Sequence, residues 1–221
     1  MKIAVLGTGM VGQALSARLA ELGHDVTIGT RDPAATLARE EYAAWVAAHD
    51  GLGLATFAEA AAGAELVMNA SGGAVTLDVL TQAGAENLAG KVLVDVSNPL
   101  DFSQGFPPTL TVKDTDSMGE QVQRAFPDAR VVKTLNTMNA GLMVHPERLG
   151  ESTSVFVSGD DAGAKETVTE LLTSFGHTDV IDLGDITTAR GAEMVLPLWL
   201  RLMGSLGTAT FNFKIVRDPN S

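Results

Sequence analysis

Three glycines near the start of the chain have the spacing of a phosphate-binding loop. Residues 7–12 read GTGMVG, a G-x-G-x-x-G that follows an apolar run at 2–6 and opens a helical pattern. In such a loop Gly7 allows a tight turn, Gly9 lets a pyrophosphate approach the backbone, and Gly12 lets helix and strand pack closely. The helix N-terminus adds free N–H groups and the positive end of its dipole. We expect a dinucleotide at this loop rather than a plain strand-to-helix turn.

The end of the second apolar run indicates which dinucleotide binds. Residues 26–33 read VTIGTRDP, so this strand ends in Thr30 and Arg31. An Asp or Glu there would accept hydrogen bonds from the ribose of NAD and would repel a 2′-phosphate, whereas an arginine can hold that phosphate through two N–H bonds. Thr8 could add another hydroxyl. We therefore expect NADPH to be preferred over NADH; the alternative is a surface ion pair between Arg31 and Asp32.

Four loops are expected to meet at the carboxyl ends of the strands, where open α/β sheets bind ligands. They are GTGMVG, ASGG at 70–73, VSNP at 96–99 and LNTMNAG at 135–141. Their small residues would let a nicotinamide ring approach the backbone, although the same residue types are also ordinary turn formers. The expected cofactor-binding residues are Gly7, Thr8, Gly9, Met10, Val11, Gly12, Thr30, Arg31, Ala70, Ser71, Gly72, Ser97, Asn98, Pro99, Asn136, Met138, Asn139 and Ala140.

The sequence contains no recognisable acid–base or metal constellation. It has no cysteine, which excludes thiolate nucleophiles and Cys-based metal sites, and its four histidines are scattered. Arg190 and Glu193 lie one helical turn apart and are expected to form a local ion pair, although they could also anchor a substrate. Arg39 is expected to lie too far along its helix to reach the phosphate. We assign no catalytic side chain and no metal ligand, which favours hydride transfer between two bound redox cofactors.

The elements that must position these loops alternate between strands and helices. Continuous apolar runs predict strands that are covered on both faces. These strands are expected at 2–6, 25–29, 54–57, 65–70, 91–96, 129–135, 153–159 and 179–183. Helical patterns lie between them at 10–22, 34–48, 58–62, 75–84, 118–126 and 162–175. This alternation predicts an α/β fold with a Rossmann-type doubly wound, mostly parallel sheet.

The last part of the chain has a different pattern. Residues 187–207 predict one long helix that is bent at Pro197, followed by an extended tail. We therefore expect an NADP-binding Rossmann domain at 1–185 and a small C-terminal helical cap with a tail at 186–221. The segment at 99–119 has no strong period and is expected to be a long loop.

Charge and hydropathy exclude several partners. The formal net charge is −12, which disfavours nucleic acid and anionic membranes. The most apolar stretch, at 194–203, is short and contains Pro197 and Arg201, so no membrane span is expected. The N-terminus lacks the pattern of a signal peptide. These features predict a soluble, cytoplasmic protein that acts on a small molecule.

Several motifs together resemble one known family. GTGMVGQAL, GTRDP, VDVSNP, ARVVKTLNTMNAG, VFVSGDD and the ARGAEM helix are similar to the NADPH-dependent reductases of coenzyme F420 and to predicted dinucleotide-binding NADP oxidoreductases. The N-terminal domains of membrane ferric reductases are more distant relatives. The resemblance implies a homodimer, a 2′-phosphate at Thr8, Thr30 and Arg31, and a deazaflavin stacked on the nicotinamide near 136–141.

The expected function is that of an NADPH-dependent oxidoreductase. Hydride would pass between NADP(H) and a deazaflavin (F420-like) or flavin-like acceptor. Two alternatives remain open. One is an NADPH-dependent reductase of a small carbonyl or imine, which needs a proton donor that the sequence does not identify. The other is a non-catalytic NADP-binding sensor or subunit.

Overall fold

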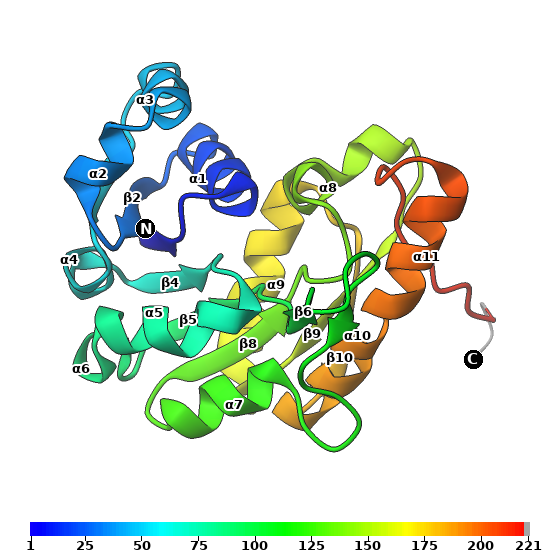
Figure 1. Cartoon of the computed structure of the whole chain (residues 1–221). Helices are drawn as coiled ribbons and strands as arrows, with labels where there is room; N and C mark the ends of the chain where they lie inside the picture. Colours follow the sequence, from blue (N-terminus) through cyan, green and yellow to red (C-terminus); the bar gives the residue numbers. More distant parts are fainter. Residues whose placement is uncertain (219–221) are drawn as a thin grey trace.

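The structure confirms a Rossmann-type α/β fold with a mostly parallel sheet. A computed structural model describes residues 1–218 of the chain. Its main sheet contains β1 (Lys2–Leu6), β2 (Asp25–Thr30), β3 (Gly53–Thr56), β4 (Leu66–Asn69), β5 (Val92–Asp95), β8 (Arg130–Thr134), β9 (Ser154–Ser158) and β10 (Asp179–Gly184). These strands lie in the order β10-β9-β8-β5-β4-β1-β2-β3 (Figure 1). The strands from β3 to β8 are parallel, and β9 pairs with β8 in antiparallel fashion. The chain reverses its direction across the sheet between β1 and β4, where a ligand crevice is expected.

Helices cover both faces of this sheet. They are α1 (Met10–Glu21), α2 (Pro33–Leu37), α3 (Glu40–Ala47), α4 (Phe57–Gly63), α5 (Thr76–Ala83), α6 (Ala85–Leu88), α7 (Met118–Ala125), α8 (Ala140–Val144), α9 (Ala162–Phe175), α10 (Ala189–Met194) and α11 (Leu196–Leu206). Short 3-10 turns lie at η1 (Gly73–Val75), η2 (Pro146–Leu149) and η3 (Ile186–Thr188). Among the described residues, no helix combines the length and apolar composition needed to cross a bilayer.

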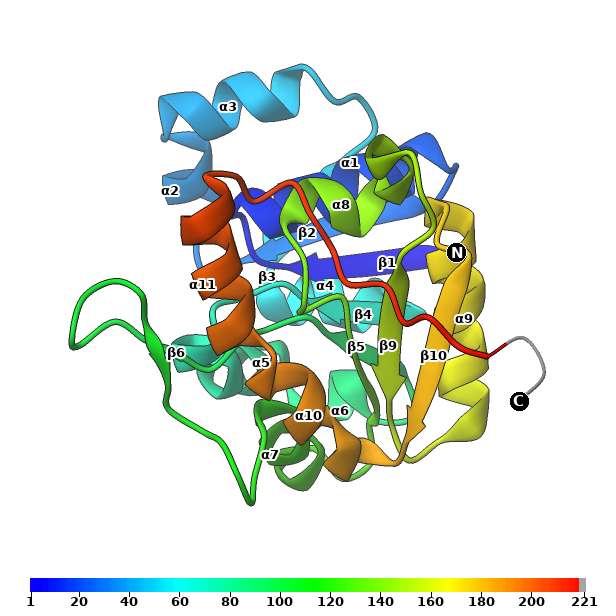
Figure 2. The ribbon, with the colours of Figure 1, turned by 90° about the vertical axis from the view of Figure 1, so that its right-hand side faces the viewer.

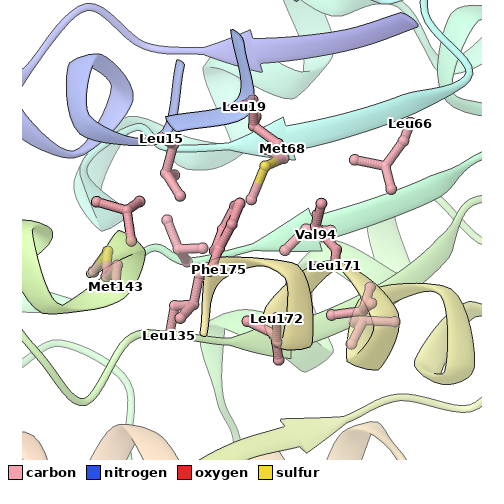
Figure 3. Close-up of a cluster of buried hydrophobic side chains, with 14 of the residues drawn as sticks. Leu15, Leu19, Leu66, Met68, Val94, Leu135, Met143, Leu171, Leu172 and Phe175 are labelled. Atoms are coloured by element: carbon pink, nitrogen blue, oxygen red, sulfur yellow. The ribbon is translucent and has the colours of Figure 1, made fainter. Parts of the chain in front are cut away.

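Strand β1 shows why its central positions are all apolar. Its side chains alternate between the two faces, so Ile3 and Val5 enter one core cluster while Ala4 and Leu6 enter the other. Helices α1, α8 and α9 pack on the first cluster, and α4 to α7 pack on the second. Figure 3 shows Phe175 of α9 at the centre of the first cluster. Both faces are therefore buried, as the continuous apolar runs predict.

Two of the predicted helices are each divided into two. The helix expected at 34–48 is two helices, α2 and α3, with Arg39 in extended backbone between them as the N-cap residue of α3. The helix expected at 187–207 is also broken, at Val195, and Pro197 lies in the first turn of α11 instead of bending a continuous helix. Proline suits a first turn because its missing N–H has no acceptor there.

The segment at 99–119 is more structured than predicted. It contains a small antiparallel pair, β6 (Leu100–Asp101) with β7 (Thr109–Leu110), beside the carboxyl end of β5.

Helix α8, in the loop after β8, was not predicted at all. The tail after α11 crosses α8 toward β9 and β10 (Figure 2). It accepts a hydrogen bond from the Ser154 N–H at the Phe213 carbonyl. Residues 219–221 of the predicted cap lie outside the described residues.

Candidate active site

The glycine loop joins β1 to α1, and each of its three glycines has a different environment. Gly7 has a φ of +133°, and a Cβ there would lie 2.7 Å from the Ala70 carbonyl oxygen. A Cβ on Gly12 would lie 2.0 Å from the Gly7 carbonyl oxygen. At Gly9, by contrast, a Cβ would face open space. Gly7 and Gly12 therefore serve the close packing of strand, loop and helix, whereas Gly9 keeps the outer surface of the loop free for a ligand.

The N-terminus of α1 is left open for an anion. Gly9 is its N-cap residue, so no side chain caps the first-turn amides, and the first turn contains no acidic residue. Uncapped amides at the positive end of a helix dipole bind phosphate groups. The exposed loop and the free helix end thus point to the same chemistry, a bound pyrophosphate.

Two arginines lie on the elements that follow this loop. Arg31, directly after β2, is exposed and forms no hydrogen bond or ion pair with the rest of residues 1–218; the expected alternative, a pair with Asp32, is not seen. Instead, Asp32 caps α2 by accepting from the Ala35 N–H. The Arg39 Nη2 donates to the Thr8 Oγ1 at 3.0 Å. The expectation that Arg39 lies too far away is therefore wrong.

The break between α2 and α3 explains this error. A continuous helix would carry Arg39 away from the strand ends, but the extended backbone at this residue turns its side chain back toward the glycine loop. Thr30, also expected at the phosphate, is buried, and its hydroxyl bonds that of Thr36 at 2.8 Å. The exposed donors near the loop are thus Thr8 and the two arginines.

The four expected loops meet at one cleft of about 650 Å³ at the carboxyl ends of the strands. Its lining is Gly9, Met10, Val11, Ala70, Ser71, Gly72, Gly73, Ala74, Val96, Ser97, Asn98, Leu100, Phe102, Met138, Asn139, Ala140, Met143 and Trp199. The lining combines the open glycine loop with an apolar part that comes from β6, α8 and α11. Leu100, Phe102, Met143 and Trp199 of this part were not among the predicted site residues.

Asn136, another predicted residue, supports the cleft from outside its lining. The Asn136 side chain donates to the Asn98 Oδ1 and to the Ala192 carbonyl, so it ties the loop after β5 to α10. The preceding residue, Leu135, is buried with a φ of +60°, a costly conformation for a bulky side chain. A Cβ on Gly73 would lie 2.1 Å from the Asn98 carbonyl oxygen. These contacts hold three of the four loops, at 70–73, 96–99 and 135–141, against one another. The predicted residues Gly7, Thr8, Gly12, Thr30, Arg31, Pro99 and Asn136 do not line the cleft itself.

A fully buried ionic cluster, which no sequence motif predicted, lies beneath the cleft. The Lys133 Nζ lies 2.8 Å from the Asp95 Oδ2 and 3.0 Å from the Glu193 Oε1, and it also donates to the Ser97 carbonyl. Asp95 in turn accepts from the Asn69 amide, whose oxygen accepts from the Ser71 hydroxyl. The cluster therefore anchors the two loops that carry Ser71 and Ser97.

Burial lowers the pKa of Lys133, but the two carboxylates outweigh burial and the net pKa lies above its ordinary value. The lysine is therefore a fixed cation. A lone Lys within the apolar run ARVVKTL was the signal that could have revealed it, because a buried lysine requires carboxylate partners.

The local ion pair predicted between Arg190 and Glu193 is also wrong. The Glu193 carboxylate accepts from the Met118 and Gly119 N–H groups at the start of α7. Arg190 forms a two-point ion pair with Glu120 instead, which lowers the pKa of that carboxyl. Arg190 and Glu193, both on α10, therefore bind α7. They fix the start of the C-terminal segment to the Rossmann sheet.

Comparison with known proteins places this chain in a family. Residues 2–99 match the family model described as NADP oxidoreductase, coenzyme F420-dependent. The chain is 31% identical over 213 residues to the F420-dependent NADP reductase of Methanothermobacter marburgensis, covering 91% of this chain and 92% of that protein. The chain belongs to the F420-dependent NADP oxidoreductase family. It is thus an NADP-dependent oxidoreductase, as its motifs predicted.

Two further relatives show how far the likeness extends. A crystal structure from Arthrobacter sp. FB24, provisionally assigned as an F420-dependent NADP reductase, is 67% identical with a TM-score of 0.97, over 98% of this chain and 100% of that chain. The metalloreductase STEAP3 of Rattus norvegicus is 30% identical over 202 residues, which is 90% of this chain. This chain spans only 38% of the length of that metalloreductase.

Two glycine-to-alanine substitutions in the loop test the separate roles of Gly12 and Gly9. We expect Gly12→Ala to destabilise the fold by about 3 kcal/mol or more, because its Cβ would collide with the Gly7 carbonyl oxygen and the backbone would have to shift. Gly9→Ala should unfold like the wild type, because its Cβ meets no atom within 4 Å, but should lose most NADPH affinity if the methyl group blocks the expected approach of the pyrophosphate. Urea unfolding and NADPH titration of both variants measure this. Equal stability of the two variants would contradict the assigned roles.

A buried histidine, His177, contacts helix α8, which carries part of the cleft. The Nε2 of the buried His177 lies 3.0 Å from the Met143 carbonyl oxygen, to which only a protonated Nε2 can donate, and its Nδ1 has no partner among residues 1–218. Burial lowers the pKa of His177 below 6.5, and the bond to Met143 opposes this shift only in part.

This lowered pKa predicts how stability depends on pH. The unfolded state binds a proton below about pH 6.5 while the folded state resists it, so the free energy of unfolding should fall as the pH is lowered from about 7 to about 5. His177→Gln keeps an N–H donor but does not titrate. Its unfolding free energy, measured in urea at several pH values, should fall less steeply than that of the wild type. Parallel slopes would show that His177 does not contribute.

Proposed function

We propose that this oxidoreductase transfers hydride between NADP(H) and a flat deazaflavin- or flavin-like acceptor, both bound in the cleft described above. The observation that carries the proposal is the lining of the cleft. It joins an anion-binding helix end to an apolar part, and none of its described residues carries a side chain that titrates near neutral pH. Such a site can orient two redox partners, but it has no side chain placed to supply a proton.

Different residues of the chain would bind different parts of NADP(H). The first-turn amides of α1 and the exposed loop at Gly9 would hold the pyrophosphate. Arg31, Arg39 and Thr8 would hold the 2′-phosphate, since all three present donors and neither arginine is bound to a carboxylate of the described residues. Ser71, Ser97 and Asn98 would border the nicotinamide ring. The pyrophosphate role fits the uncapped N-terminus of α1 and the open space at Gly9.

The reaction moves one hydride. When bound, NADPH supplies the hydrogen nucleus with both electrons of its C–H bond, and the same pair forms a new C–H bond on a deazaflavin or an N–H bond on a flavin. The protein's part is to hold the two rings together and to exclude water, which the apolar residues at Leu100, Phe102 and Met143 can do.

An acceptor survey tests this function. The protein is mixed with NADPH and, in separate reactions, with F420, FMN, riboflavin, a ferric chelate and a panel of small carbonyls and imines, and the loss of reduced nicotinamide absorbance is followed. We expect turnover with F420 or a flavin, at a rate that changes little across neutral pH. Turnover confined to carbonyls or imines, with a rate that falls as one acidic group deprotonates, would contradict the proposal.

Three further expectations remain predictions. They are the homodimer, the cytoplasmic location and the division of the chain into 1–185 and 186–221.

A further inference from the structure

The apolar part of the cleft contains one aromatic side chain from the C-terminal segment. Trp199 of α11 lines the cleft, and its ring stacks on Phe211 of the tail with a centroid distance of 5.2 Å and an interplanar angle of 22°. The two residues come from different elements, since α11 ends at Leu206. The C-terminal segment thus brings a two-ring aromatic wall to a cleft that is otherwise built by the Rossmann loops.

The tail that backs this wall is firmly attached. Asn139, itself in the cleft lining and the N-cap residue of α8, donates to the Ala209 carbonyl. The Asn212 side chain donates to the Thr153 hydroxyl and to the Ser154 carbonyl at the start of β9. Phe211 lies between these two attachments. Its ring is therefore held in place before any ligand binds, which is the condition for a preorganised binding surface.

Nothing in the described chain explains Trp199 as a structural hydrogen-bond donor. Its Nε1 is covered from solvent but has no hydrogen-bond partner within residues 1–218. Buried indole N–H groups usually find a partner, and leaving one unpaired has a cost. Only packing and the stack on Phe211 hold the ring. The other tryptophan, Trp45, lies on α3 and stacks with His49, away from the cleft lining.

We infer that Trp199 determines which acceptor the enzyme uses, by packing its indole ring, backed by Phe211, against the planar ring system of the acceptor. This inference rests on the proposed function, because it assigns a residue to the acceptor's part of the same cleft. The acceptor class is a fused aromatic ring of flavin or deazaflavin size, since a small carbonyl would gain little from a surface of two stacked rings. The contact assigned here is made by the ring and not by the N–H group, so a phenyl ring at this position should retain most of it.

Kinetics with a matched set of variants test the inference. The probes are F420 and FMN, each with NADPH, and the variants are Trp199→Leu, Trp199→Phe and the control Trp45→Leu. We expect Trp199→Leu to raise the KM for the acceptor about tenfold while the KM for NADPH changes less than about twofold, because stacking on an aromatic side chain contributes on this order. Trp199→Phe keeps a ring and should stay within about threefold of the wild type, and Trp45→Leu should leave the acceptor KM unchanged.

The outcomes separate the two proposals. If the wild type turns over neither F420 nor FMN, the proposed function fails. If the wild type turns over but Trp199→Leu leaves the acceptor KM unchanged, or raises the KM for NADPH equally, the assignment of Trp199 is overturned. A thermal unfolding scan identifies a variant that does not fold, and in that case Trp199→Phe and Phe211→Leu give the result. Phe211→Leu is expected to raise the acceptor KM at least threefold without changing that for NADPH, and no change in it would overturn the inference.

Discussion

Replacing Lys133 with methionine is expected to lower the free energy of unfolding by about 3–5 kcal/mol, because two carboxylates would remain buried without their cation. Methionine fills a similar volume, so the loss reports the missing charge and not a cavity. Asp95 and Glu193 are both almost fully buried, and neither can gain solvent without opening the packing between β5, β8 and α10. Equilibrium unfolding in urea measures the change.

A lysine whose carboxylate partner is open to solvent provides the control. The Lys165 Nζ lies 2.8 Å from the Asp182 Oδ2; the lysine side chain is 15% exposed, but the carboxylate is 53% exposed and can be solvated without its partner. Exposed ion pairs contribute little, so Lys165→Met should cost less than about 1 kcal/mol. In a second variant, Asp95→Asn added to Lys133→Met should recover part of the loss, because one uncompensated charge is removed. If Lys133→Met were as stable as Lys165→Met, the buried cluster would not anchor the cleft loops.

Removing both guanidinium groups, in Arg31→Ala/Arg39→Ala, is expected to weaken NADPH binding about 10- to 100-fold and to leave NADH binding within about twofold. A charge-assisted hydrogen bond to phosphate contributes about 1–3 kcal/mol, and two arginines that share one phosphate are not additive. The chain has a formal net charge of −12, so its overall field would not attract the phosphate once these two arginines are removed. Titration of each single and double variant with both cofactors measures the effect.

The single variants distinguish the two arginines. Arg31 is expected to contribute through direct contact alone. Arg39 also holds the Thr8 hydroxyl, so its loss should free that side chain as well. Arg130→Ala is a suitable control, because Arg130 binds the Gly90 carbonyl and does not line the cleft. An equal loss of NADH affinity in the double variant would mean that the arginines serve the fold or the pyrophosphate and not the 2′-phosphate.

Much of the fold could be predicted because the physical signals are local. Continuous apolar runs such as KIAVL and KVLVDV have one stable use, a strand covered on both faces, and the glycine spacing fixes the turn between β1 and α1. Helix interruptions were harder to predict. The residues of 34–48 favour a helix throughout, yet the chain breaks at Arg39, where contact with Thr8 and the packing of α3 decide the conformation. Such tertiary contacts override local propensity.

The site residues could likewise be predicted where the signal is local and not where tertiary contacts decide. The rule that ligands bind at the carboxyl ends of parallel strands predicts which four loops meet, and the structure brings them to one cleft. Trp199 and Phe102 reach this cleft from segments whose path no local pattern determines. Lys133 was hidden because its partners, Asp95 and Glu193, are far away in sequence. The pairing of β5 with β8 brings Asp95 to Lys133, and the packing of α10 adds Glu193, so spacing along the chain does not reveal the cluster.

The central claim is that the donors beside the glycine loop recognise the 2′-phosphate of the cofactor. Calorimetric titration of the wild-type protein with 2′,5′-ADP and with 5′-AMP tests it most directly, because these ligands differ only in that phosphate. We predict that 2′,5′-ADP binds at least tenfold more tightly than 5′-AMP, and that this difference shrinks as salt is added. Equal affinities for the two nucleotides at low salt would contradict the account.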